Sequence, residues 1–176
     1  MTYRTYIIGW LLALVAGCGS VQTAMAPGPS IIDLGEIKAV TARTAKLHPS
    51  VASWKLALGF SWSNQAPDKV TIKPGVRRLT TIANERIQTA VFTTGDTEIV
   101  ARLLDAGLHE STFAITLAEF QQLYEADQVS LRVTQYEKTH EDNFGPNDSN
   151  PFMHKRMGQF LDKIAQVKAQ MEAAES

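Results

Sequence analysis

The chain has 176 residues, of which 44% are hydrophobic and 20% are charged, and its net charge is −1 at pH 7. These proportions are those of an ordinary globular protein, so we do not expect disorder over most of the chain. A charge so close to zero also argues against the basic surface of a nucleic-acid-binding protein, and no nucleic acid partner is expected.

The first 17 residues have the features of an export signal. Arg4 supplies the only charge, and residues 6–15 form an apolar run. The apolar centre of a signal peptide has about 7–15 residues, whereas a helix that crosses a bilayer needs about 20. The run therefore predicts export and not a membrane-spanning segment.

The apolar run leads into residues 14–18, LVAGC, which contain the only cysteine of the chain. This segment resembles the lipobox of bacterial lipoproteins. The resemblance implies cleavage before Cys18 and acyl chains, palmitate among them, on the new N-terminal residue, which anchor the protein to a membrane. An ordinary signal peptide cleaved after Ala26 is the alternative, but Pro27 follows that site directly, and proline there usually blocks cleavage.

The residue after Cys18 is Gly and not the Asp that, in many enteric-type bacteria, retains a lipoprotein in the inner membrane. The resemblance thus implies an anchor in the inner leaflet of the outer membrane, with the domain facing the periplasm. Once Cys18 is acylated, no thiol is left for a disulfide bond. Packing alone then has to stabilise the domain.

These features divide the chain into a signal peptide at residues 1–17, an acylated flexible tether at 18–30 and a single domain at 31–176. The tether contains Gly, Ser, Thr and Pro and shows no apolar periodicity. The remainder, roughly 150 residues, is one domain in length and can bury a hydrophobic core. Removal of the signal leaves 16 basic and 18 acidic residues.

From residue 31 onward, apolar and polar residues alternate at period two, which is typical of β-strands. The clearest strand covers residues 54–62 and places Trp54, Phe60 and Trp62 on one face. A turn is expected at Pro74-Gly75, where Gly supplies a positive φ, and a hairpin at residues 94–96. The other expected strands are at residues 31–34, 37–43, 70–72, 76–82, 86–92, 98–103 and 111–115.

Helical signals come late in the chain. The pair Thr116 and Glu119 fits a capping box and predicts a helix at residues 116–126, followed by a strand at 128–136. Residues 137–150 are polar and rich in Gly, Pro, Asn and Asp, so a long exposed loop is expected there. An amphipathic helix should then cover about residues 151–173, with Asn150 as its N-cap and Pro151 as its first residue.

A run of strands followed by helices predicts an α+β fold. We expect a mostly antiparallel β-sandwich or partly open barrel, with one short helix and a C-terminal amphipathic helix. Two interpretations of the aromatic face remain open: Trp54, Phe60 and Trp62 form the core, or they form a ligand or partner surface on which Trp62 is partly exposed. The C-terminal helix likewise either packs on its own sheet or presents Met157 and Phe160 to a partner.

No catalytic or metal motif is complete. His140, Asp142 and His154 are weak candidates for metal ligands, but their spacing fits no metal-binding motif, and no metal or other cofactor is expected. Ser61 lies in a segment close to G-x-S-x-G, with His48 or His109 as a conceivable base. However, the last residue of the motif differs, and the segment is a strand instead of a strand-to-helix turn.

The sequence therefore predicts a non-enzymatic, lipid-anchored structural or adaptor subunit that holds an envelope protein partner at the membrane. The alternative is a lipoprotein that binds a small apolar ligand or a lipid, with the aromatic face lining a cavity. A metal-dependent hydrolase built on the segment from His140 to His154 is the less favoured third interpretation.

Overall fold

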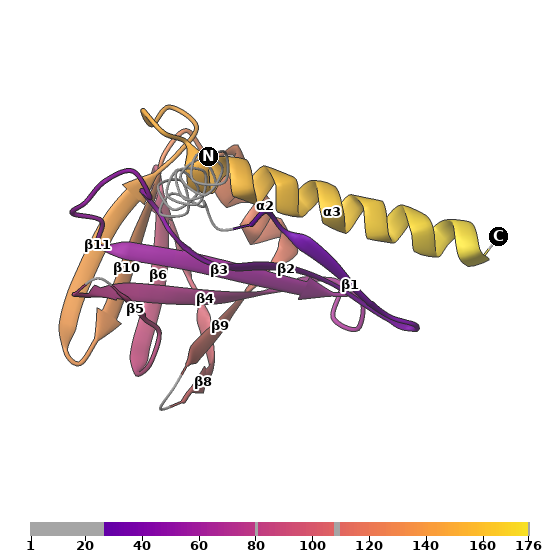
Figure 1. Ribbon diagram of the computed structural model, residues 1–176, viewed down its shortest axis with the longest axis horizontal. Helices are drawn as coiled ribbons and strands as arrows, with labels where there is room; N and C mark the ends of the chain where they lie inside the picture. The colour runs from indigo at the N-terminus through magenta and orange to yellow at the C-terminus, as the bar shows by residue number, and fades with distance from the viewer. Residues whose placement is uncertain (1–26, 80, 108–109, 176) are drawn as a thin grey trace, which may run out of the picture.

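A computed structural model describes residues 27–79, 81–107 and 110–175 of the chain. The described part contains two antiparallel β-sheets, which do not close into a barrel, and two helices (Figure 1). The predicted fold class, α+β with a mostly antiparallel sandwich or open barrel and a C-terminal helix, is confirmed. The predicted signal peptide, Cys18 and most of the tether lie outside the described residues.

Seven of the described strands form the first sheet, in the order β1-β2-β3-β4-β9-β8, with β5 paired to the end of β4. Val40, Trp62, Val70 and Ile115 lie side by side across four of them, so they share one face, which we call the inner face. The strands are β1 Ser30–Leu34, β2 Ile37–Lys46, β3 Leu56–Ser63, β4 Lys69–Arg78, β5 Thr81–Ala83, β8 Arg102–Ala106 and β9 Ser111–Thr116.

The inner face is covered by two different structures. The second sheet, in the order β11-β10-β6-β7, contacts β3 and β4 toward one end, and helix α3 contacts β2 toward the other (Figure 1). These elements are β6 Ile87–Thr94, β7 Thr97–Val100, β10 Val129–Gln135, β11 Lys138–Phe144, α2 Leu117–Glu125 and α3 Phe152–Glu175.

Three phenylalanines join the sheet to both helices. The ring of Phe60 on β3 lies 5.2 Å from Phe120 on α2 and 4.8 Å from Phe160 on α3, both edge to face, a favourable geometry for aromatic pairs. Phe60, Trp62, Met157 and Phe160 are at most 2% exposed. They are core residues, so the interpretation of these four as an accessible surface is wrong, and so is the partial exposure expected for Trp62.

Trp54 lies apart from the other aromatic residues of this segment, on the opposite, outer face of the sheet. Its ring contacts Nζ of Lys46, 5.0 Å from the ring centroid, and the guanidinium of Arg77 at 5.9 Å. Strand register puts both cations on the outer face. The expected single strand at residues 54–62 is therefore wrong at its start, because β3 begins only at Leu56.

The expected turn at Pro74-Gly75 is also wrong, since both residues lie inside β4. Pro74 is tolerated because β4 pairs with neither β9 nor β5 at this residue, and the carbonyl on that side accepts a hydrogen bond from Nδ2 of Asn84 (3.0 Å). Gly75 is needed because a Cβ there would collide with Ile82. The glycine thus serves a close approach instead of a turn.

The strand expected at residues 98–103 is divided between the two sheets. β7 pairs with β6, whereas β8 pairs with β9. Between them the N–H of Ala101 donates to the carbonyl of Ala90 (3.0 Å) as the chain crosses over. The hairpin at residues 94–96 is confirmed, with Gly95 at a φ of 53°.

The long loop expected at residues 137–150 is wrong for residues 138–144, which form a strand, β11, hydrogen-bonded to β10 along its whole length. A two-residue turn joins them, with Tyr136 and Glu137 at φ values of 49° and 64°, the left-handed conformation that tight hairpins require. Neither residue is a usual turn former, and six of the seven β11 residues are at least partly exposed. The sequence therefore lacks both signals that normally reveal a hairpin.

The two helices lie where they were expected. The capping box of α2 is confirmed: Thr116 N–H donates to Oε2 of Glu119 (2.6 Å), and Glu119 N–H donates to Oγ1 of Thr116 (3.1 Å). Helix α3 begins at Phe152, and its first turn closes with Lys155 N–H donating to the carbonyl of Pro151 (3.0 Å). No helix in the described ranges is long and apolar enough to cross a membrane.

Candidate functional site

The β1–β2 hairpin exposes three large apolar side chains. Ile32, Leu34 and Ile37 are 43%, 70% and 37% exposed. Leu34 and Ile37 pair across the hairpin, and Ile32 is two residues from Leu34, so all three lie on the outer face, whereas Ile31 points to the core. We call these three residues the hairpin patch.

The described residues also leave one side of the β1 main chain without a strand partner. β1 ends the strand order of the first sheet, and no strand in the described part of the chain pairs with its other edge. The unpaired N–H and C=O groups of an edge strand are a template for an added strand, and exposed apolar residues beside them favour such pairing. The hairpin patch and the free edge therefore form one candidate binding surface.

Local hydrogen bonds hold this hairpin in shape. Gly35 N–H donates to Oδ1 of Asp33 (3.0 Å), and Nζ of Lys38 lies 2.6 Å from Oδ2 of the same carboxylate. These two partners, the lysine first, lower the pKa of Asp33 below its ordinary value. Asn64 at the end of β3 accepts from Lys38 N–H (2.9 Å) and donates to the carbonyl of Glu36 (2.8 Å). The hairpin is thus pre-organised before any partner arrives.

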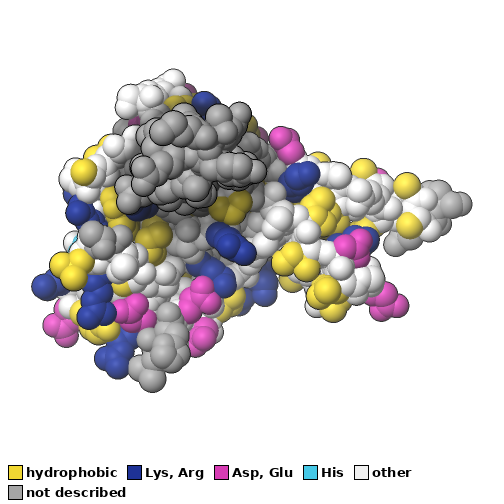
Figure 2. All heavy atoms as spheres, in the orientation of Figure 1, with side chains coloured by type: hydrophobic (Ala, Val, Ile, Leu, Met, Phe, Trp, Pro, Cys, Tyr) yellow, Lys and Arg dark blue, Asp and Glu magenta, His cyan; other side chains and the backbone are white. Residues whose placement is uncertain are grey.

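Helix α3 lies along β1 and β2 and projects past the rest of the molecule (Figure 1). Its last fully buried residue is Val167, and between residues 168 and 174 only Met171 is partly buried. In the space-filling view this part of the molecule forms an arm that carries scattered apolar side chains (Figure 2). Most of the arm is solvent-exposed.

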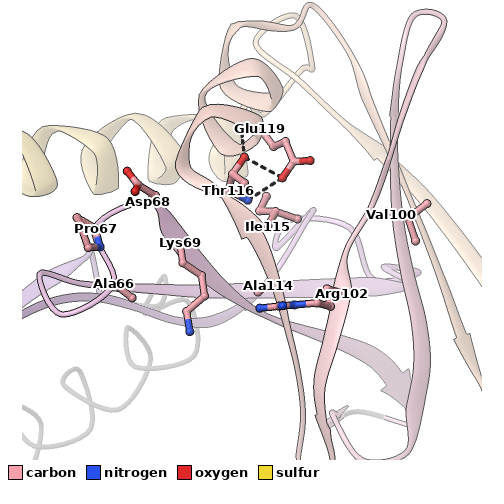
Figure 3. Close-up of a pocket in the computed structure, with 10 residues that line it drawn as sticks. All are labelled: Ala66, Pro67, Asp68, Lys69, Val100, Arg102, Ala114, Ile115, Thr116 and Glu119. Atoms are coloured by element: carbon pink, nitrogen blue, oxygen red, sulfur yellow. Dashed lines mark hydrogen bonds between the residues drawn. The ribbon is translucent and has the colours of Figure 1, made fainter.

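A second candidate site is an open hollow of about 440 Å³ on the outer face of the first sheet. It is bounded by the β3–β4 turn, the start of β4, the crossover from β7 to β8, the end of β9 and the first turn of α2 (Figure 3). A volume of this size is within the range of small-molecule sites, about 300–1,000 Å³. Neither Phe60 nor Trp62 lines this hollow, so the aromatic face has no part in it.

A buried arginine fixes the point where the N-terminal segment joins the domain. Arg156 on α3 is 2% exposed, and its two terminal nitrogens donate to the carbonyls of Pro27 (2.7 Å) and Arg43 (2.8 Å). Burial lowers the pKa of Arg156. A bulge in β2 next to Arg43 interrupts its pairing with β3, and Arg156 bonds this interrupted segment.

The histidine and carboxylate candidates do not converge. His140 lies opposite Val133 on β11, whereas His154 stacks on Tyr124 at 4.6 Å and bonds its carbonyl (3.0 Å). Asp142 lies 3.5 Å from Nε2 of His48, which also bonds the carbonyl of Asn143 (2.6 Å). Within the described ranges no group of three His, Cys, Asp or Glu residues could hold a metal ion.

Ser61 shows no arrangement for nucleophilic catalysis among the described residues. It lies within β3, opposite Thr41 and Thr71, and His48 is engaged with β11. His109, the other conceivable base, lies outside the described residues. The hydroxyl is therefore one of several small polar groups on the outer face.

Sequence reasoning missed both candidate surfaces for different reasons. The residues of the hairpin patch belong to the two strands expected at residues 31–34 and 37–43, but their exposure depends on β1 being at the edge of the sheet. Lys69 and Arg102, the cations of the hollow, belong to no motif and meet only because β4 and β8 both pair with β9. Comparison of this chain with protein-family models, curated proteins and solved structures finds no match.

Proposed function

We propose that this protein is a lipid-anchored lipoprotein of the bacterial envelope that faces the periplasm. Its domain acts as a non-enzymatic adaptor, and the hairpin patch with the free edge of β1 binds a protein partner. The observation that carries the adaptor role is the exposure of Ile32, Leu34 and Ile37 at an unpaired sheet edge. The anchor is supported by the resemblance of residues 14–18 to a lipobox.

The partner chemistry follows from the edge. An extended segment added to β1 would satisfy its free main-chain groups, and side chains at alternate positions of that segment would pack on Ile32 and Leu34. Main-chain pairing supplies affinity and the apolar contacts supply specificity. We therefore expect a partner that contributes an extended segment with apolar residues at alternate positions.

The anchor limits where the domain can work. The ten residues from Cys18 to Pro27, which make nine steps along the chain, span at most about 30 Å when fully extended. Arg156 bonds the carbonyl of Pro27 and so fixes where this segment meets the domain. An anchored domain with a pre-organised hairpin would present the hairpin patch close to the membrane surface.

The anchor is tested by mass spectrometry of protein purified from its native host. We expect a mature chain that begins at Cys18 and carries the mass of its acyl groups, and a Cys18→Ser variant that keeps its leader and is not acylated. A chain that begins at Pro27 without acyl mass, or wild-type protein with the leader attached, would contradict the anchor.

The adaptor role is tested by photo-crosslinking in the native envelope. A crosslinking amino acid at position 34 should capture one protein, whereas the same group at Leu79, 86% exposed at the opposite end of the sheet, should not. The captured protein, once identified and purified, should bind wild type and Leu79→Asp equally but lose binding to Leu34→Asp. Equal binding to both variants would refute the hairpin patch as the contact.

A further inference from the structure

Two cations extend into the hollow of Figure 3 from strands that flank β9. Lys69 pairs with Thr116 and Arg102 pairs with Ala114. Since Phe113 and Ile115 of β9 are on the inner face, both cations extend from the outer face. Figure 3 shows their side chains directed into the same space beside β9.

Neither cation has an ion pair or a hydrogen bond to its side chain within residues 27–79, 81–107 and 110–175. Lys73, which lies four residues after Lys69 on the same face of β4, is paired with Glu110 at 3.0 Å. Like charges that share a space repel each other. An anion between Lys69 and Arg102 would remove this repulsion.

Neither acidic residue of the hollow, Asp68 or Glu119, forms an ion pair with Lys69 or Arg102. Oε2 of Glu119 already accepts hydrogen bonds from the N–H and the hydroxyl of Thr116, at 2.6 and 2.9 Å. Asp68 points away from Lys69 and Arg102 in Figure 3. The positive charge is thus concentrated at one part of the hollow.

Apolar surface lies next to the cations. Val100 is 65% exposed at the rim, just before the chain crosses between the sheets. Ala114 lies beneath, next to Arg102 in the strand pairing, and Pro67 lines the opposite side (Figure 3). A ligand that satisfies both features has a charged group joined to an apolar part.

We infer that this hollow binds an oxyanion, a phosphate or carboxylate, attached to a small apolar group. The planar guanidinium of Arg102 can hold two oxygens of such a group side by side, and the ammonium of Lys69 adds a point charge. Val100 contacts the apolar part. This chemistry is shared by anionic lipid headgroups and by soluble organic phosphates. The inference does not rest on the proposed adaptor role, because the hollow and the hairpin patch are separate sites.

The test is calorimetric titration of the full chain in a neutral detergent. The titrants are hexyl phosphate, inorganic phosphate and hexanol. We expect hexyl phosphate to bind most tightly, because only it supplies both parts. Removal of one cation by Lys69→Ala or Arg102→Ala should weaken hexyl phosphate roughly tenfold, the loss of one charge-assisted contact. Val100→Ser should weaken hexyl phosphate and leave inorganic phosphate unchanged.

The matched control is Lys73→Ala, which removes a cation from the same face but outside the hollow. Its affinity for hexyl phosphate should equal that of wild type. No detectable binding to the wild type, or equal losses in Lys73→Ala and Lys69→Ala, would refute the site. Arg102→Lys, which keeps the charge but loses the planar fork, should still bind more weakly than wild type.

A second arm separates the two ligand sources. Short-chain phosphatidylglycerol and short-chain phosphatidylcholine are titrated in the same detergent. Stronger binding of the anionic lipid, lost in Lys69→Ala, identifies a lipid headgroup as the ligand. Binding of hexyl phosphate without a preference between the lipids identifies a soluble organic anion. If neither lipid nor hexyl phosphate binds, the inference is wrong.

Discussion

The two faces of the first sheet differ in almost every property. The inner face is covered by the second sheet and by the helices, and Phe60, Trp62 and Phe160 are at most 2% exposed there. The outer face carries small hydroxyl side chains such as Thr41 and Ser61, which stay partly exposed. Trp54 covers one end of that outer face, and the hairpin patch lies at the other.

Because of this difference, the residues that stabilise the fold and the residues that form the candidate binding surfaces lie on different faces of the sheet. Covered aromatic contacts stabilise the fold, whereas both candidate binding surfaces, the hairpin patch and the hollow, lie on the outer face. Substitutions on the inner face should therefore lower the free energy of unfolding. Most substitutions on the outer face should change only what it binds.

The largest effect is expected from Phe160→Ala. The ring is fully buried against Phe60 and Phe120, so its removal leaves a closed cavity and should lower the free energy of unfolding by about 3–5 kcal/mol. Urea unfolding of the full chain measures this loss. Gln170→Ala, on the exposed side of the same helix, should change stability by less than about 0.5 kcal/mol.

Trp54→Ala sharpens the comparison because Trp54 is buried but belongs to the outer face. Water can enter the space that the ring leaves, so only the transfer free energy is lost, about 2–3 kcal/mol. The same urea experiment should therefore place this variant between wild type and Phe160→Ala. A loss as large as that of Phe160→Ala would mean that the outer face also has a closed core at this end.

Arg156→Met tests the hydrogen bond that joins Pro27 to helix α3. The variant leaves the carbonyls of Pro27 and Arg43 without this donor, which we expect to cost about 1–2 kcal/mol. Amide hydrogen exchange of Gly28 and Ser30 should increase at the same time. Arg156→Lys, which can reach only one carbonyl well, should give an intermediate rate. Unchanged exchange in both variants would show that Arg156 does not hold this segment.

Leu34→Asp should leave stability within about 0.5 kcal/mol of wild type, because the side chain is 70% exposed. Equal unfolding midpoints for Leu34→Asp and Leu79→Asp would place the hairpin patch outside the stabilising core. A large loss of stability at position 34 alone would break the comparison, since the hairpin would then support the fold.

The smallest effect concerns the stability of the β1–β2 hairpin at low pH, which depends on Asp33. Lys38 and Gly35 lower the pKa of Asp33 in the folded protein from its ordinary value of 3.8. A carboxyl with a lowered folded pKa stabilises the fold above its unfolded pKa, and this contribution is lost as the pH falls through the folded value. An NMR titration should show the low pKa, and Lys38→Met should raise it. A pKa unaffected by Lys38→Met would rule out the ion pair as its cause.

Much of the fold could be predicted because its signals are local. The capping box of Thr116 and Glu119 marked the start of α2, and the period-two pattern located most strands. The aromatic residues Phe60 and Trp62 could be placed on a buried face but not assigned to core or cleft. That choice depended on α2 and α3, whose contacts come from residues about 60–100 positions away.

The errors share one cause. Pro74 looked like a turn because the free side of β4 depends on where β9 and β5 end. The segment 138–144 looked like a loop because β11 is an edge strand with little to bury. The strand at residues 98–103 looked continuous because nothing local marks Ala101 as a crossing between sheets.

The sequence by itself showed the resemblance of residues 14–18 to a lipobox, both helices and most of the strands, and which residues are apolar enough to form a core. Only the tertiary structure decided which face each aromatic residue joins, that the hairpin patch lies on a free edge, and that Lys69 meets Arg102. The physical reason is that periodicity encodes the environment of one strand, whereas a binding surface depends on which strands are neighbours and which edge has none.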